Sequence, residues 1–204
     1  MKYIELSHKI SKRTITYPTD PDFEINVEKT IDKNNSLLHS FKMGTHTGTH
    51  MDAPSHIIPD GKNLDDFHLD NFIGSAIVVD IETLESLDDY PDKIDGLIYN
   101  SFWYKNFKKA EIYYGTDRPQ IPKKIIEFSI KNNLKFFGCD LPSVDQSGSK
   151  DKPIHNSLLK KEIIIYESLN NLGRLPKNTP FQFYGVPLPI EGIEGCPVRA
   201  FAAL

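Results

Sequence analysis

The chain has 204 residues, of which 39% are hydrophobic and 25% are charged, as in a globular protein rather than a disordered or fibrous one. Its formal net charge of −4 comes from 24 basic and 28 acidic residues spread along the whole sequence. This balance gives no indication of binding to nucleic acid or to a membrane, and no apolar run approaches the roughly 18 residues of a membrane span. Charge within the apolar N-terminal stretch argues against a signal peptide, so we expect a cytoplasmic protein.

We expect a single domain over residues 1–204, because chains of this length commonly fold around one core and no repeat or low-complexity linker divides the sequence. Short apolar runs rich in β-branched residues recur along the chain, and such runs are typical of strands. The predicted strands cover residues 3–6, 23–27, 76–81, 97–99, 135–137, 163–166 and 181–186.

Two helices are predicted. The longer one begins at Pro122, whose fixed φ suits a first helical turn, and ends before residues 132–133. One side of this helix would carry Ile125, Ile126, Ser129 and Ile130. The shorter helix spans about residues 155–161. Many strands and few helices indicate a mixed α/β or α+β domain with a large sheet that could curl toward a barrel, although the pattern does not determine the strand order.

Histidines cluster in residues 46–56, HTGTHMDAPSH, which hold three of the seven in the chain. Imidazole and carboxylate groups are the usual protein ligands of zinc and similar ions, and a catalytic site uses three while leaving a position for water. His46, His50 and Asp52 meet this requirement. The glycine and proline in the segment disfavour the helix of a zincin, so we expect these side chains where a strand meets a loop. Any one histidine alone would more simply be a solvated or buried side chain.

A second polar group of residues lies about a hundred positions later. Asp140 and Asp145 precede His155, and Glu167 directly follows an apolar run. A glutamate at that place is often only the polar end of a strand, so the pattern leaves its role open.

Several other residues have no predicted function. His8, His39 and His68 lack ligand-like partners, and Cys139 and Cys196 lack the paired spacing of a thiolate site, so we expect surface or packing roles. We interpret Trp103 and Tyr104 as core residues rather than a substrate platform. The acidic pairs are expected to be solvated turns: Asp65 with Asp66, and Asp88 with Asp89.

Four segments together resemble the cyclase-like metal hydrolases, a family that includes bacterial kynurenine formamidase and, more distantly, isatin hydrolase. Residues 46–56 are similar to its H-x-G-T-H-x-D-A-P-x-H signature, and residues 138–145, GCDLPSVD, to its G-x-D-x-P-S-x-D segment. His155 and Glu167 stand at the family's twelve-residue separation. The ending PLPIEG, at residues 187–192, and GCPVRA, at residues 195–200, also follow the family's pattern.

The resemblance implies a divalent-metal centre with two ions per subunit, zinc being expected and manganese the alternative. His46, His50 and Asp52 would hold one ion, and Asp52, His155 and Glu167 would hold the other. Two cations that share a carboxylate would lower the pKa of bound water, supply hydroxide near neutral pH and polarise a carbonyl group. His56 resembles the family's catalytic histidine and would serve as general acid and base.

The resemblance further implies a swivelling β/β/α fold with a barrel-like sheet, assembled as a homodimer or larger homo-oligomer, and a small-molecule amide substrate. An arylformamidase acting on N-formylkynurenine or a similar aryl formamide is the leading hypothesis. Tyr17 occupies a position where kynurenine formamidases often have tryptophan, and it could stack on an aryl ring. Two alternatives stay open: hydrolysis of a cyclic amide such as isatin or of another small amide or lactone, and non-catalytic metal binding.

Overall fold

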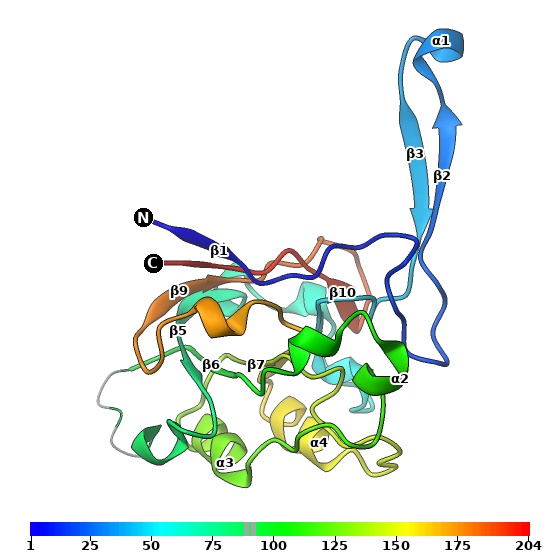
Figure 1. The fold of residues 1–204 in the computed structure, drawn as a ribbon. Coiled ribbons are helices and arrows are strands. Elements are labelled where there is room, and N and C mark those ends of the chain that lie inside the picture. The colour runs from blue at the N-terminus through cyan, green and yellow to red at the C-terminus, as the bar shows by residue number, and fades with distance from the viewer. Residues whose placement is uncertain (88–89, 91–92) are drawn as a thin grey trace.

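The computed structural model of the chain describes residues 1–87, 90 and 93–204, so the predicted turn at Asp88 and Asp89 lies outside the described residues. The fold centres on a curled mixed sheet with the strand order β1-β11-β9-β5-β6-β7-β8-β4-β10 (Figure 1). In chain order its strands are β1 (Tyr3–Glu5), β4 (His50–Asp52), β5 (Ile73–Val79), β6 (Gly96–Tyr99), β7 (Phe136–Cys139), β8 (Ile164–Glu167), β9 (Phe181–Tyr184), β10 (Gly195–Pro197) and β11 (Phe201–Ala203).

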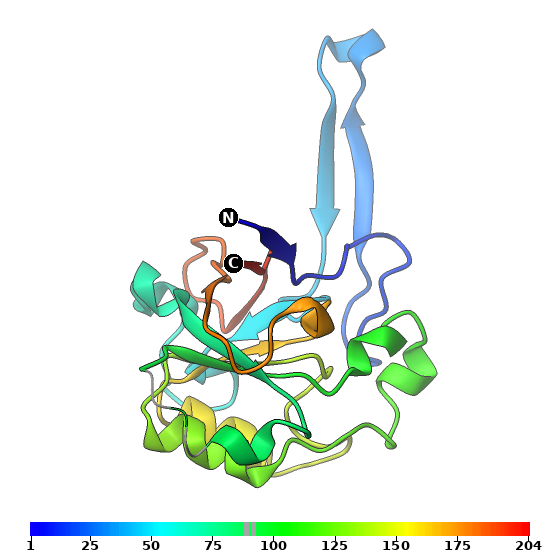
Figure 2. The same cartoon turned by 60° about the vertical axis from the view of Figure 1, so that its left-hand side comes forward.

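The middle of the sheet is parallel and its two sides are antiparallel. Strands β5, β6, β7 and β8 run parallel to one another, and a parallel connection needs a crossover segment. Helix α3 (Lys123–Lys131) lies in the crossover from β6 to β7, and helix α4 (Pro153–Leu159) lies in the next one. Both helices cover the same face of the sheet, as the two ribbon views show (Figures 1 and 2). A further short helix is α2 (Ala110–Tyr113).

The strands alternate their side chains between two apolar clusters. Phe136 and Ile164 belong to the cluster on one face, whereas Phe137 and Ile165 belong to the cluster that α3 and α4 cover. Glycine is required at Gly96, opposite Phe136, because a Cβ there would lie 1.9 Å from Cε2 of that ring. The hydrophobic side chains of the central strands are thus buried on both faces, which explains their nearly continuous apolar sequences.

A long β-hairpin projects from the body of the molecule (Figures 1 and 2). It consists of β2 (Glu24–Lys29) and β3 (Leu38–Lys42), with the single turn of α1 (Ile31–Asn34) near its tip. No residue of either strand is buried, and apolar side chains along the hairpin are exposed: Val27, Ile31, Leu37, Leu38 and Phe41. Such a projection of apolar side chains without a core of its own is typical of a contact region for another molecule.

Each of the seven predicted strands corresponds to a strand in the structure, and both predicted helices are present. Several boundaries differ from the prediction. Strand β5 begins at Ile73 rather than at residue 76 and ends at Val79, and Ile81, which the sequence predicts to belong to it, is 67% exposed. Pro122 is the N-cap of α3 rather than its first residue. Ile125, Ile126 and Ser129 are buried as predicted, and Ile130 packs partly buried against the same cluster. The prediction missed the strands β3, β4, β10 and β11.

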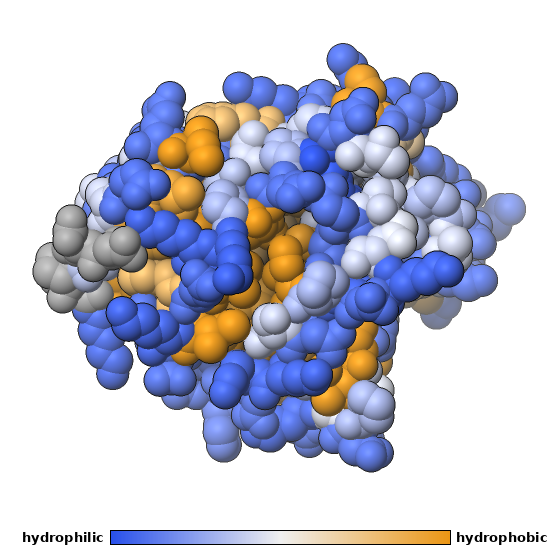
Figure 3. All heavy atoms as spheres, turned by 90° about the horizontal axis from the view of Figure 1, so that it is seen from below, coloured by the Kyte–Doolittle hydropathy of each residue, from blue (hydrophilic) through white to orange (hydrophobic). Residues whose placement is uncertain are grey.

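The outer surface of the molecule on the side of α3 and α4 carries many hydrophilic side chains, with apolar side chains visible between them (Figure 3). Partly buried residues of the underlying cluster include Ile57, Phe128, Ile130 and Ile154. Within the described part of the chain, every helix is too short or too polar to cross a bilayer.

Candidate metal centre

The six side chains that the sequence singles out for chemistry converge at one place. His46 lies in the turn before β4, whereas His50 and Asp52 lie on β4 itself, so the segment forms a loop and short strand rather than a helix. His56 ends the 3-10 helix η1 (Pro54–His56) that follows. Strand β4 pairs antiparallel with β8, and this register places His50 directly opposite Glu167.

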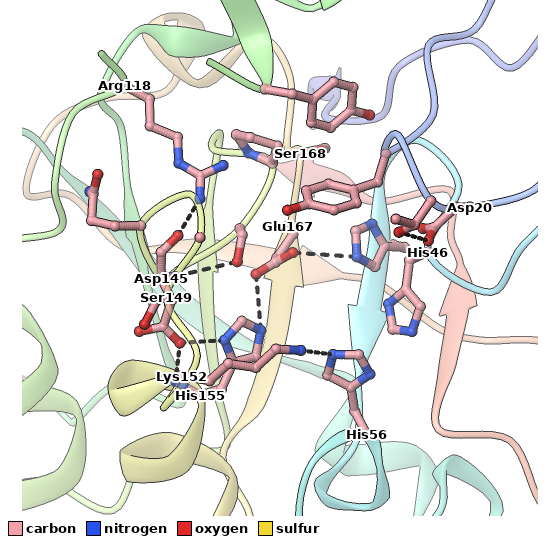
Figure 4. Close-up of a pocket in the computed structure, with 18 residues that line it drawn as sticks. Asp20, His46, His56, Arg118, Asp145, Ser149, Lys152, His155, Glu167 and Ser168 are labelled. Carbon is pink, nitrogen blue, oxygen red and sulfur yellow. Dashed lines mark hydrogen bonds and ion pairs between the residues drawn. The ribbon is translucent and has the colours of Figure 1, made fainter. Parts of the chain in front are cut away.

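The carboxylate of Asp52 lies at the middle of this cluster. Its Oδ1 is 2.9 Å from His46 Nδ1 and 3.5 Å from His50 Nε2, and its Oδ2 is 3.5 Å from His155 Nε2. Glu167 closes the arrangement, with Oε2 3.5 Å from His50 Nε2 and Oε1 3.4 Å from His155 Nε2. Figure 4 shows His155 and Glu167 pointing toward one another, with His46 and His56 beside them.

Two groups of side chains in the described residues are close enough to hold a metal ion. One comprises His46, Asp52 and His56, and the other comprises His50, Asp52 and Glu167, with the ligand atoms of each group within 4.8 Å of one another. Asp52 belongs to both groups, as a bridging carboxylate would. Both of its oxygens are buried without a hydrogen-bond partner in the protein, because the close imidazoles do not approach them in hydrogen-bond geometry. A buried carboxylate costs free energy unless a cation or donors satisfy it, so this arrangement fits a divalent ion.

Hydrogen bonds outside the cluster orient two of the imidazoles. His50 Nδ1 donates to the carbonyl oxygen of Gly48 at 2.9 Å, and His155 Nδ1 donates to Asp145 Oδ2 at 2.6 Å. The other carboxylate oxygen of Asp145 accepts from the main-chain N–H of Ile154 at 2.8 Å. Each imidazole therefore presents its Nε2 to the cluster, and such outer partners commonly fix the ring and tautomer of a metal-ligating histidine.

The cluster perturbs the protonation of its own members. Burial lowers the pKa of His46, but the charge of Asp52 and a hydrogen bond with Glu194 outweigh this effect and raise it to about 10. Burial likewise opposes protonation of His155, while hydrogen bonding to Asp145 raises its pKa to about 11. Burial raises the pKa of Asp52, but the neighbouring imidazoles hold it well below its ordinary value. Without metal, the anionic centre therefore retains protons that a cation would replace.

His56 differs from the other imidazoles of the site. Its ring centroid lies 4.4 Å from that of His46, and Lys152 Nζ is 3.3 Å from its Nε2. Burial is the largest effect on its pKa; with the positive charges of His46 and Lys152 it outweighs the opposite effect of Asp52 and lowers the pKa to about 4. His56 is therefore neutral at physiological pH and can accept a proton.

A cavity of about 350 Å³ opens over the cluster. Its size suits a small organic molecule, and it is lined by both polar and aromatic groups. Tyr17, which the sequence predicts as a substrate contact, lines it with Tyr114, and the two rings meet edge to face at 5.5 Å. Other lining residues are His46, His50, His56, Arg118, Asp145, Lys152, His155 and Glu167.

Sequence reasoning missed several residues of the site. Glu194 lies 3.1 Å from His46 Nε2, and Arg118, Lys152 and Tyr114 line the cavity. Each is a single residue of a common type in a segment without distinctive spacing, so the sequence carries no signal for it. Asp140, by contrast, lies apart from the cluster: its side chain accepts hydrogen bonds from Ser101 and from the main chain of Tyr104.

The residues without a predicted function are placed as expected. His39, His68, Asp65 and Asp66 are exposed, and the ring of His8 stacks on Phe107. Trp103 and Tyr104 pack against the two apolar clusters. Both cysteines, Cys139 and Cys196, are buried free thiols.

Comparisons with known proteins agree with this geometry. The sequence profile of the Cyclase family, described as "Putative cyclase", matches residues 4–146. Kynurenine formamidase of Salinibacter ruber is 30% identical over 208 residues, covering 98% of this chain and 96% of the relative.

Two solved structures share the fold. Isatin hydrolase A from Labrenzia aggregata, bound to benzyl benzoate, superposes with a TM-score of 0.84 at 22% identity, covering 98% of this chain and 93% of that one. A structure described as a potential metal-dependent hydrolase with cyclase activity has a TM-score of 0.78 at 17% identity, covering 98% and 96% of the two chains. With a profile match over more than half its length and a relative at 30% identity over nearly all of it, the chain belongs to the Cyclase family.

Proposed function

We propose that the protein is a metal-dependent hydrolase that opens the amide bond of an aryl formamide of the N-formylkynurenine type. The observation that carries this proposal is the convergence of three imidazoles and two carboxylates on the floor of a cavity, around a buried Asp52 whose oxygens contact imidazole nitrogens without forming hydrogen bonds. The similarity to kynurenine formamidase over 98% of the chain supports the choice of substrate class.

We assign His46, His50 and Asp52 to one divalent ion and Asp52, His155 and Glu167 to a second. Mixed imidazole and carboxylate donors suit zinc and also manganese. When bound, such cations lower the pKa of water and polarise a carbonyl group, which is the chemistry that hydrolysis of an amide requires. Asp145 supports the assignment, because its hydrogen bond to Nδ1 of His155 holds the ring with Nε2 facing the carboxylates of Asp52 and Glu167.

The remaining groups of the cavity handle protons and the aryl ring. His56 is neutral at physiological pH and borders the cluster, so it takes a proton from the attacking water and then delivers it to the departing nitrogen. The positive charge of Lys152, next to His56, disfavours a protonated His56 and so promotes transfer of its proton to the departing nitrogen. Tyr17 offers an aromatic face to the ring of the substrate at the cavity wall.

The experiment that tests this function compares two amides on metal-loaded protein. We expect kcat/KM for N-formylkynurenine to exceed that for isatin by at least about tenfold, because an open formamide can be placed on the cluster without fitting a fused ring. Product formation is followed by chromatography. Preference for isatin would instead support the second candidate, hydrolysis of a cyclic amide. Metal binding without turnover of either amide would indicate the non-catalytic alternative.

We further propose a homodimer in which the β2–β3 hairpin contacts the second copy, within the cytoplasm. The exposed side chains of Val27, Leu38 and Phe41 support this arrangement, and the buried free thiols are compatible with a reducing compartment. Replacing Phe41 by lysine is expected to convert the dimer into monomer, as measured by light scattering coupled to size-exclusion chromatography. Substitution of the exposed Leu69, outside the hairpin, serves as control, and a Phe41→Lys protein of unchanged mass would contradict the proposal.

A further inference from the structure

A buried arginine lines the cavity, and two of its three side-chain nitrogens have no hydrogen-bond partner among the described residues. Arg118 lies in the loop between α2 and α3 and is only 4% exposed, yet it lines the cavity. Its Nη2 donates to the main-chain carbonyl oxygen of Asp145. Nε and Nη1 have no hydrogen-bond partner, and no carboxylate in the described part of the chain forms an ion pair with this guanidinium.

The carboxylate of Asp145, whose main-chain carbonyl oxygen Arg118 contacts, already accepts hydrogen bonds from other groups. Oδ1 of Asp145 accepts from the main-chain N–H of Ile154, and Oδ2 accepts from the main-chain N–H and the Nδ1 of His155. The only contact that Arg118 makes there is with the carbonyl oxygen of that residue. This bond anchors the guanidinium in place and leaves its charge uncompensated.

A buried guanidinium stays charged, because an arginine side chain is not deprotonated in proteins. Unused N–H donors in such a group cost free energy that an anionic ligand can recover. Figure 4 places the Arg118 guanidinium on the Asp145 side of the cavity, across from His46 and Asp20. An anionic group of a substrate bound beside Arg118 would therefore lie away from His46. The scissile amide of the same substrate could then still reach the candidate metal ligands at the His46 end.

We propose that Arg118 binds a carboxylate of the substrate and thereby selects amides that carry one. This inference rests on the proposed function and names the feature of the substrate that the site recognises. A planar guanidinium with free N–H groups matches the two oxygens of a carboxylate. The acidic side chains of Asp52 and Glu167 disfavour an anion directly over the cluster. Lys152, the other cation that lines the cavity, contacts His56, which leaves the position beside Arg118 as the favourable one for an anion.

The test compares two substrates that differ only in this charge, N-formylkynurenine and its methyl ester, on metal-loaded wild type, Arg118→Gln, Arg118→Lys and the control Arg174→Gln. Arg174 is exposed and does not line the cavity, so its loss changes net charge alone. We expect wild type and Arg174→Gln to prefer the acid about 10- to 100-fold in kcat/KM, the effect of a charged hydrogen-bonded pair. Arg118→Gln should lose this preference, mainly through KM, and Arg118→Lys should retain part of it.

A wild-type protein that hydrolyses acid and ester equally would overturn the inference, and this comparison needs no variant to fold. An Arg118→Gln protein slowed equally on both substrates would also overturn it, since Arg118 would then only support the cluster. If wild type hydrolyses neither formamide, the proposed function fails. The binding of kynurenine and of its methyl ester, measured by calorimetry, then decides the role of Arg118. Tighter binding of the acid by wild type, lost in Arg118→Gln, supports the inference. Equal binding of acid and ester by wild type overturns the inference.

Discussion

Replacing Asp52 by asparagine is expected to remove bound metal and to lower kcat/KM by more than about 1000-fold, because several kcal/mol of charge stabilisation depend on the ion. Asparagine preserves the shape of the side chain but removes the charge that both candidate metal groups share. Metal content is measured by elemental analysis of the purified protein, and turnover is measured with N-formylkynurenine. Wild-type protein treated with a chelator should lose activity in the same way and regain it with zinc or manganese.

Asp70→Asn provides the matched control, since Asp70 is exposed and lies outside the cavity. Chelator-treated protein that keeps full activity, or an Asp52→Asn protein with wild-type turnover, would refute the metal-dependent mechanism.

The metal affinity should also rise with pH. In the metal-free centre the pKa values of His46 and His155 are raised to about 10 and about 11, so both imidazoles carry protons at neutral pH that the ion must displace. Calorimetry in buffers of different ionisation enthalpy measures this proton release.

Replacing His56 by alanine is expected to lower kcat by about 10² to 10⁴-fold, the usual contribution of a general acid and base, with little change in bound metal. The physical reason is that His56 borders the cluster and is neutral at physiological pH, so it can carry a proton between water and the departing nitrogen. Added imidazole should restore part of the activity because it can enter the space that the side chain leaves. Single-turnover measurements separate this loss from any effect on substrate binding.

The control for His56 is His68→Ala, which removes an exposed histidine outside the cavity. Because His56 also lies within ligand distance of His46 and Asp52, the metal content of His56→Ala distinguishes two roles. Loss of metal in parallel with activity would show that His56 is a ligand and would reject its assignment as the proton carrier. Full activity without His56 would contradict both roles.

Apart from the exposed strand β2, the elements that follow from the sequence are those whose side chains are buried in a regular pattern. Continuous β-branched runs predict β5 and β8 because central parallel strands are buried on both faces. The spacing of Ile125, Ile126 and Ser129 predicts α3 for the same reason. Strand β3 is exposed throughout, so no apolar pattern marks it, and its pairing depends on the partner strand of the hairpin.

The short strands β4 and β10 depend still more on tertiary contacts. The residues of β4, His50–Asp52, form a strand because β8 and β10 lie on either side of it and satisfy its backbone. No local propensity in the histidine-rich segment predicts this, and the same pairing brings His50 opposite Glu167. The sequence thus predicted which side chains meet at the candidate site, since their types and spacing are local properties of the chain.

What the sequence determined by itself is the inventory of candidate metal-ligating groups and the regular core elements around them. The tertiary structure decided how those groups meet, through the β4–β8 register and the packing of α4 against the sheet. It also brought Arg118 and Glu194 to the site from segments without any motif. A lone arginine or glutamate has no recognisable spacing, and its burial, its free donors and its neighbours exist only once distant parts of the chain have packed together.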